Sequence, residues 1–137
     1  MKALRIDHLG VAVRSIDETL EVYRALGLVE AEGSREDVPG QQVRVAFLPV
    51  GESRIELLEP SSDESPVAKF LARRGPGVHH VCFAVEDLEA ALAELAGKGF
   101  RLIHRTPVAG AGDKRVAFLH PEAADGVLVE LAEKKPA

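Results

Sequence analysis

Two histidines and two glutamates occupy equivalent positions in the two halves of the sequence. His8 and His80 are 72 residues apart, and Glu56 and Glu130 are 74 residues apart. Imidazole nitrogens and carboxylate oxygens together form the mixed ligand sets that suit divalent cobalt, nickel, manganese or zinc. A buried carboxylate is costly without a partner, and a bound metal ion removes that cost. These residue types therefore predict a divalent metal site with open positions for water or substrate.

The sequence around these four residues is an internal duplication. The text IDHLGVAV of the first half recurs as VHHVCFAV in the second half, and RIELLE recurs as LVELAE. The pentapeptide RVAFL appears in both halves, at 44–48 and at 115–119. Matches at a nearly constant spacing indicate that the chain is built from two similar halves. If a pseudo-twofold axis relates the halves, the two histidines and the two glutamates converge near it.

Small and large side chains alternate in the two segments that carry the histidines. Because side chains alternate across a strand, each histidine shares a face with small residues, and the larger apolar residues lie on the other face. The small residues are Gly10 and Ala12 in the first segment and Cys82 and Ala84 in the second. The large face suits packing against a helix, and the small face suits a cavity wall. His79 is out of phase with His80, so we expect it to pack or hydrogen-bond elsewhere.

The sequence predicts a strand, a helix and three further strands in each half. Ser15 opens a capping box and starts a helix that ends at Gly27, while Asp87 caps a helix that ends near Gly97 or Gly99. Between the halves, Ser65 precedes a proline and starts a short connector helix. The strands predicted after each helix are 29–33, 42–50 and 54–59 in the first half and 101–106, 114–120 and 126–133 in the second.

These elements define two βαβββ modules within a single domain of residues 1–137. Module one extends from about residue 4 to 60, and module two extends from about 77 to 133. The connector helix lies in the segment 61–76. A chain of 137 residues is of ordinary size for one domain, which agrees with one domain made of two similar halves.

Composition and charge argue against several classes of function. With a net charge of −5 and a pI of about 5.5, general binding to nucleic acid or to anionic membranes is not expected. No apolar run is long enough to span a bilayer, and residues 1–10 lack the features of a secretion signal, so a cytoplasmic location is predicted. The single cysteine, Cys82, is expected to be a buried, inert thiol.

Three further residues are candidates for contact with a substrate. His120 follows the strand-like segment 115–119 and either lines the cavity or caps a turn. Lys114 and Arg115 follow the text GAGD, where they could hold a phosphate or carboxylate of a ligand. That text lacks the spacing of a phosphate-binding loop, so a turn or a mobile rim is expected there. His104 is expected at the surface, away from any site.

The longer motifs resemble the vicinal oxygen chelate superfamily and, within it, the methylmalonyl-CoA epimerase family. The resemblance rests on IDHLGVAV, VGESRIELLEP, DESPVAKFLARRGPGVHHVCFAV, GDKRVAFLHP and GVLVELAE, which cover nearly the whole chain. It implies an α+β fold in which two pseudo-symmetric βαβββ modules form a cupped, partly closed mixed sheet with the helices outside. It also implies that a divalent metal, Co²⁺ first and Mn²⁺, Ni²⁺, Zn²⁺ or Mg²⁺ as alternatives, is held by His8, Glu56, His80 and Glu130.

The resemblance further implies an activity, the interconversion of (R)- and (S)-methylmalonyl-CoA by a cytoplasmic homodimer. A metal at the thioester oxygen would stabilise the enolate that forms when the α-proton leaves. The free carboxylate of the substrate can bind the same metal and so fix its orientation. One group must then remove the proton and another must return one on the opposite face. Glu130 is predicted to be one of these two groups.

One position departs from the pattern of well-known epimerases. Those enzymes carry a further glutamate on the strand that matches 43–48, where this chain has Val45. Valine cannot transfer a proton. At the position of Glu56, some of those enzymes carry glutamine. We therefore hypothesise that Glu56 is both a metal ligand and the second acid or base.

Three rival functions would use the same residues differently. A glyoxalase-I-type lyase resembles the epimerase in its ligand types and would act on a thiol-derived hemithioacetal. A non-catalytic binder of the same superfamily would have an aromatic-lined site, and the aromatic content of 4% and the lack of tryptophan argue against one. A ring-cleaving iron dioxygenase needs two histidines and one glutamate, and Glu56 would fill the position that it leaves open for oxygen.

Overall fold

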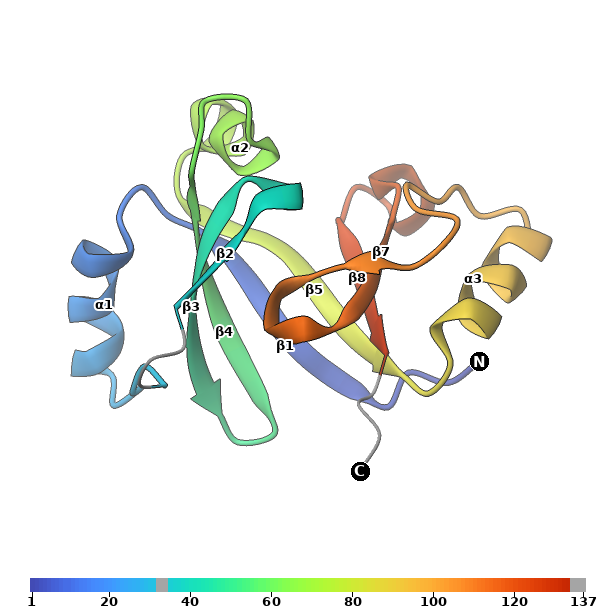
Figure 1. Ribbon diagram of the computed structural model, residues 1–137, viewed down its shortest axis with the longest axis horizontal. Coiled ribbons are helices and arrows are strands. Elements are labelled where there is room, and N and C mark those ends of the chain that lie inside the picture. The colour runs from blue at the N-terminus through green and yellow to red at the C-terminus, as the bar shows by residue number, and fades with distance from the viewer. Residues whose placement is uncertain (32–34, 134–137) are drawn as a thin grey trace. The chain divides into compact units, whose positions relative to one another are not determined.

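The chain divides into two compact units in the computed structural model, which describes residues 1–31 and 35–133 (Figure 1). The first unit is His8–His79, and the second unit is Met1–Asp7 together with the chain from His80 onward. Helices and strands occur in both units, so the fold is α+β. None of the described helices is long and apolar enough to cross a membrane.

The first unit contains a four-stranded mixed sheet with the strand order β2-β3-β4-β1. The strands are β1 (Arg5–Ala12), whose first three residues belong to the second unit, β2 (Glu36–Val38), β3 (Val43–Val50) and β4 (Ser53–Pro60). β1 runs parallel to β4, whereas β2 and β4 are both antiparallel to β3. The turn between β3 and β4 contains Gly51 at a φ of 58°, a conformation that glycine adopts without a steric cost.

Helix α1 (Ile16–Ala25) packs on one face of this sheet. It begins after Ser15, whose hydroxyl accepts a hydrogen bond from the amide of Glu18, as the capping-box pattern predicts. Its contact with the sheet is a buried apolar cluster made by Val13, Ile16, Leu20, Ala46, Leu48 and Leu57. Helix α1 thus covers the face of the sheet that carries the larger apolar residues of β1. The opposite face of β1 carries His8 and the candidate site.

The second unit contains an equivalent sheet with the strand order β5-β8-β7-β6. The strands are β5 (Gly77–Val85), whose first three residues belong to the first unit, β6 (Val108–Ala109), β7 (Arg115–Leu119) and β8 (Val129–Glu133). β5 runs parallel to β8, whereas β6 and β8 are both antiparallel to β7. The N-terminal segment is hydrogen-bonded to β5, because the amide of Leu4 donates to the carbonyl of Ala84 at 2.9 Å.

Helix α3 (Leu88–Gly97) covers the second sheet as α1 covers the first. Asp87 caps it by accepting a hydrogen bond from the amide of Ala90, as predicted. The buried cluster beneath it consists of Val85, Leu88, Ala91, Leu92, Leu95, Ala117, Leu119 and Leu131. Each βαβββ module therefore has its own layer of apolar packing between one helix and one sheet.

The duplication also extends to a polar contact that ties each helix to its sheet. Glu59, at the end of β4, accepts a hydrogen bond from the first amide of α1 at Ile16, at 3.0 Å. Glu133, at the end of β8, accepts one from the first amide of α3 at Leu88, at 3.4 Å. The first amides of a helix have no partner within the helix, and a carboxylate there is favourable for the helix dipole. These contacts fix where each helix starts on its sheet.

The connector contains helix α2 (Pro66–Arg74), as the sequence predicts. Ser65 is fully buried, and its hydroxyl accepts a hydrogen bond from the amide of Val67. The other short elements are the 3-10 turns η1 (Pro39–Gln41), η2 (Ala111–Asp113) and η3 (Pro121–Ala124). Their sequences carry the proline and glycine residues that favour turns.

The predicted α+β class and the repeated βαβββ modules are confirmed, but two predicted strands are wrong. Residues 29–31 form no strand, and the rest of the prediction at 29–33 lies outside the described residues; β2 begins at Glu36 instead. The prediction at 101–106 reduces to one bridge between Leu102 and Leu119. The reason is that the amides of Ile103 and His104 both donate to the carbonyl of Phe118, so the hydrogen-bond ladder stops there.

Candidate metal centre

In the first unit, parallel strands β1 and β4 bring His8 against Glu56. The register pairs Gly10 with Glu56, and His8 lies two residues before Gly10 on the same face of β1. The Nδ1 atom of His8 is 3.1 Å from Oε2 of Glu56. Both side chains are almost fully buried, at 5% and 3% exposure. The sequence therefore places a buried nitrogen and a buried oxygen in contact within one module.

The second unit repeats this arrangement with β5 and β8. The register pairs Cys82 with Glu130, and His80 lies two residues before Cys82 on the same face. The Nε2 atom of His80 is 3.0 Å from Oε1 of Glu130, and both side chains are 5% exposed. The ring of Phe118 packs edge-on against His80, with ring centroids 5.4 Å apart. Each module thus builds the same buried histidine–glutamate pair.

The dimensions of each pair fit two neighbouring ligands of a divalent ion. Such an ion binds nitrogen or oxygen at about 2.1 Å, and two ligand atoms at right angles then lie about 3.0 Å apart. The observed separations are 3.1 Å and 3.0 Å. A buried carboxylate needs a compensating positive charge, which a neighbouring cation or a bound metal ion can provide. The donor sets of the two modules are therefore chemically suited to a metal.

Arg54 also binds Glu56, and sequence analysis gave it no role. Its Nε and Nη2 atoms lie 2.8 Å and 2.6 Å from Oε2 of Glu56. Arg54 is two residues before Glu56 on β4, so both side chains project from the same face. In the sequence, the signal for this contact is the spacing of two residues on one predicted strand. Many charged pairs with that spacing on exposed strands have no function.

His79 packs outside the candidate site, as predicted. Its ring lies edge-on against the ring of Phe70 in α2, with centroids 5.1 Å apart. His104 was expected at the surface, but it is half-buried. Its Nδ1 atom accepts a hydrogen bond from the amide of Phe118 at 3.0 Å. Burial lowers the pKa of His104 below its usual value, although the charge of Glu130 acts in the opposite direction.

The three candidates for substrate contact are engaged with groups of this chain. The Nδ1 atom of His120 accepts from the amide of Glu122 and so caps η3, which is one of the two roles considered for it. Arg115 lies 2.7 Å from Glu89 and 3.4 Å from Glu133. A role of His120 or Arg115 in substrate binding stays a prediction.

Lys114 forms an ion pair that sequence analysis did not foresee. Its Nζ atom is 2.8 Å and 3.0 Å from the two carboxylate oxygens of Asp7. The side chains of Lys114 and Asp7 are 13% and 3% exposed. Because the lysine is committed to a buried carboxylate, its contact with a substrate also stays a prediction.

Val45 is buried in β3 at 1% exposure and pairs with Leu58 in the register of β3 and β4. Its environment is that of a core residue. This position of β3 therefore contributes an apolar side chain, which cannot transfer a proton.

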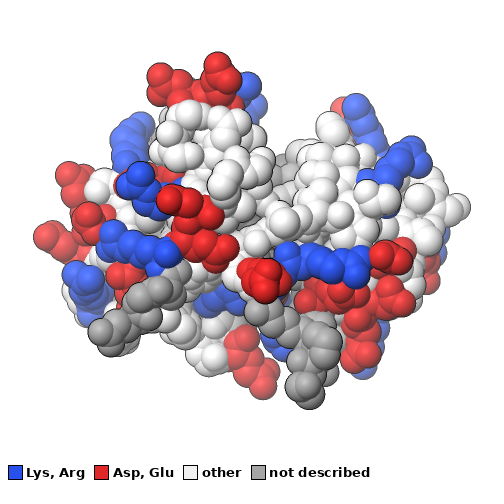
Figure 2. Space-filling model, in the orientation of Figure 1, with Lys and Arg blue, Asp and Glu red and all other residues white. Residues whose placement is uncertain are grey.

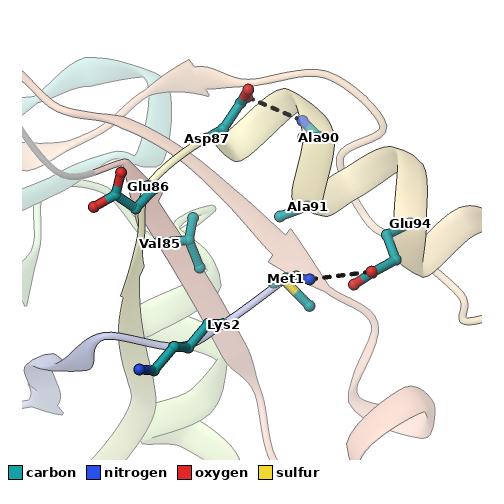
Figure 3. A pocket seen from close by; sticks show the side chains of 8 residues that line it. All are labelled: Met1, Lys2, Val85, Glu86, Asp87, Ala90, Ala91 and Glu94. Carbon is teal, nitrogen blue, oxygen red and sulfur yellow. Dashed lines mark hydrogen bonds and ion pairs between the residues drawn. The ribbon is translucent and has the colours of Figure 1, made fainter.

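A pocket of about 220 Å³ beside α3 does not contain the predicted site residues (Figure 3). Three of its polar residues have local roles: Asp87 caps α3, and the amino group of Met1 lies 3.1 Å from Oε1 of Glu94. That amino group lowers the pKa of the exposed Glu94 carboxyl.

On the face shown in Figure 2, acidic and basic side chains are interspersed on the surface of this chain, whose net charge is −5.

Residues 7–118 match the profile of the Glyoxalase/Bleomycin resistance protein/Dioxygenase superfamily, and the chain belongs to this superfamily. The ethylmalonyl-CoA/methylmalonyl-CoA epimerase of Cereibacter sphaeroides is 37% identical over 94% of this chain and 97% of that protein. The structure of a variant of Streptomyces coelicolor methylmalonyl-CoA epimerase in complex with 2-nitronate-propionyl-CoA is 38% identical, with a TM-score of 0.93 over 99% of this chain and 98% of that chain. YqjC of Bacillus subtilis, an uncharacterised protein, is 42% identical over 96% of this chain and 93% of its own length. Within the superfamily, the chain thus belongs to the methylmalonyl-CoA epimerase family, whose members are isomerases.

Proposed function

We propose that the chain is a metal-dependent epimerase that interconverts (R)- and (S)-methylmalonyl-CoA. The observation that carries this proposal is the buried histidine–glutamate pair, which is built twice, at His8 with Glu56 and at His80 with Glu130. Relatives named as epimerases of this substrate match the chain at 36% and 37% identity over nearly its whole length. The proposed substrate carries a thioester, which acidifies the α-proton, and a free carboxylate, which can bind the metal.

The two pairs would together hold one divalent ion. We expect Co²⁺, with Mn²⁺, Ni²⁺, Zn²⁺ or Mg²⁺ as alternatives, because two nitrogens and two oxygens form a mixed ligand set. When bound, the ion supplies the positive charge that favours an enolate over the neutral thioester. The chain itself supplies the four ligands, excludes water from them by burial, and moves the protons.

Two carboxylates are available for proton transfer. In our proposal, one of Glu130 and Glu56 takes the α-proton from one face of the substrate, and the other returns a proton to the opposite face. Glu56 is the candidate for the second position because Val45 is apolar and buried, and because Glu56 is the counterpart of Glu130 in the duplication. The roles reverse when the other epimer is the substrate.

The proposal extends to the setting of the enzyme. We propose an acyl-CoA substrate, a homodimer and a cytoplasmic location. The bound 2-nitronate-propionyl-CoA of the Streptomyces coelicolor enzyme supports the substrate class. Light scattering on the purified protein measures the mass in solution, and a monomer at micromolar concentration would contradict the homodimer.

A direct assay distinguishes the epimerase from its rivals. Purified protein loaded with Co²⁺ should convert (S)-methylmalonyl-CoA into an equal mixture of both epimers. The same protein should not act on methylglyoxal with glutathione or another thiol. Activity in the second assay alone would identify a glyoxalase-I-type lyase. Binding of ligand without either activity and without metal would identify a non-catalytic binder.

A further inference from the structure

Glu56 is bound on one oxygen by two different side chains. Oε2 receives Nε and Nη2 of Arg54 at 2.8 Å and 2.6 Å, and it is 3.1 Å from Nδ1 of His8. All of these contacts fall on Oε2, and none of them uses the other oxygen, Oε1. A carboxylate held by three nitrogen atoms in this way has a fixed orientation.

Arg54 is itself held in place. Its guanidinium carbon lies 5.4 Å from the ring centroid of Phe47, within the range of a cation–π contact. Phe47 is the residue of β3 that pairs with Glu56 in the register of β3 and β4. The side chain of Arg54 is 18% exposed. The guanidinium thus lies against an aromatic ring and a buried carboxylate, and its planar geometry suits both contacts.

The duplication is broken at this residue. The offset that relates Glu56 to Glu130 relates Arg54 to Leu128. Phe47 has a counterpart in Phe118, which pairs with Glu130 in the register of β7 and β8, but the ring of Phe118 contacts His80. A leucine side chain cannot donate a hydrogen bond, so the two glutamates have different neighbours at an otherwise equivalent position.

From this asymmetry, we infer that Arg54 is a positioning residue for Glu56. Its two donors on Oε2 fix the orientation in which the Glu56 carboxylate faces the metal and the substrate. Residues that bind a metal ligand from outside fix its orientation, and their loss commonly weakens metal affinity or activity by about 10- to 100-fold. The inference rests on the proposed function only in assuming that a metal binds at Glu56.

The test replaces Arg54 by the residue at its counterpart position. Arg54→Leu should weaken the binding of Co²⁺ to metal-stripped protein, measured by calorimetry, by about 10- to 100-fold. It should also lower kcat for methylmalonyl-CoA by more than it raises KM. Arg54→Lys keeps the charge but not the fork of donors, so it should recover part of the loss. Arg24→Leu, which changes an exposed arginine at the end of α1, is the matched control and should leave both constants unchanged.

The outcomes separate the inference from the proposed function. A folded Arg54→Leu protein whose Co²⁺ affinity and absorption spectrum match the wild type would overturn the inference, whatever its activity. Weakened binding that Arg54→Lys does not improve would assign the effect to lost packing against Phe47 and would also overturn it. Wild-type protein that binds Co²⁺ without epimerase activity would contradict the proposed function, and calorimetry alone would then decide the role of Arg54.

Discussion

The carboxyl groups of Glu56 and Glu130 lie in equivalent strands, each within 3.1 Å of a histidine nitrogen. At the scale of single residues, we propose that both of them bind the metal and transfer protons. Replacing either by glutamine keeps an oxygen ligand but removes the group that carries the proton. This substitution therefore separates the two roles.

Glu130→Gln should lower kcat by about 10²- to 10⁴-fold, the usual contribution of a general acid or base, while the protein keeps its fold. Glu56→Gln should lower turnover in the same way. Both are measured at saturating Co²⁺, with the metal content determined in parallel, and Glu52→Gln in the exposed turn after β3 is the control. If Glu56→Gln keeps its metal and turns over at nearly the wild-type rate, Glu56 is not the second base.

His104 gives a prediction about pH. Burial lowers its pKa, so the imidazole stays neutral in the folded chain at pH values where the unfolded chain, with a pKa of about 6.5, takes up a proton. The free energy of unfolding should therefore fall as the pH drops through about 6.5, and it should be unaffected by this group above that pH. Protonation of Nδ1 would also break its hydrogen bond with the amide of Phe118.

The check is urea unfolding of the wild type and of His104→Asn between about pH 7.5 and 5.5. The variant has no titrating side chain at this position, so it should lose less stability over this interval than the wild type. Equal losses in the two proteins would mean that His104 titrates normally in the fold.

At the scale of elements, a buried ion pair connects the end of the segment between β6 and β7 to the start of the chain. Lys114, at its end, contacts both carboxylate oxygens of Asp7, which is 107 residues earlier in the chain. The segment itself contains one 3-10 turn, with Gly112 and Asp113 at positive φ, and it follows a strand of only two residues. Little regular structure fixes it, so the ion pair should contribute strongly to its order.

Removing Lys114 takes away the cation at 2.8 Å and leaves the buried Asp7 carboxylate with the more distant Arg5 guanidinium at 3.6 Å. Lys114→Met should reduce the free energy of unfolding by about 3 kcal/mol, and the double variant Asp7→Asn with Lys114→Met should recover a large part of that loss. The neighbouring Arg115→Met, whose ion pairs are half-exposed, should change stability by less than about 1 kcal/mol. Equal effects of Lys114→Met and Arg115→Met in denaturant titrations would show that burial of the pair carries no particular weight.

The elements also show which features the sequence could predict. The helix starts at Ser15, Asp87 and Ser65 can be predicted because capping depends on side chains within the same turn. The strand expected at 101–106 is wrong because Ile103 and His104 share one acceptor on β7, which is a contact between distant segments. Sequence patterns within one turn therefore predict where a helix starts better than they predict where an edge strand lies.

The same distinction applies to the site. The histidine–glutamate pairs could be predicted because the duplication repeats residue type and strand phase together, and each pair is found within its own module. The roles of Arg54 and Asp7 could not be predicted, because an arginine or aspartate on a strand has no periodic signature and depends on which charged partner the register brings near. Whether His8, Glu56, His80 and Glu130 bind one ion stays a prediction.

At the scale of the whole molecule, a duplicated module provides two similar histidine–glutamate pairs, and their two carboxylates would suit a reaction that must exchange a proton on either face of one carbon. Membership of the epimerase family agrees with this chemistry. In the proposed reaction the fold supplies two equivalent halves, and Arg54 in place of a leucine makes the halves different.

The exchange of the α-proton of methylmalonyl-CoA for deuterium, followed by mass spectrometry in D₂O, tests this account most directly. With Co²⁺-loaded protein, we expect one deuterium at the α-carbon of both epimers. Removal of the metal with a chelator should suppress this exchange, and added Co²⁺ should restore it. Absence of deuterium incorporation with Co²⁺, Mn²⁺, Ni²⁺, Zn²⁺ and Mg²⁺ alike would contradict the assignment of the chain as a methylmalonyl-CoA epimerase.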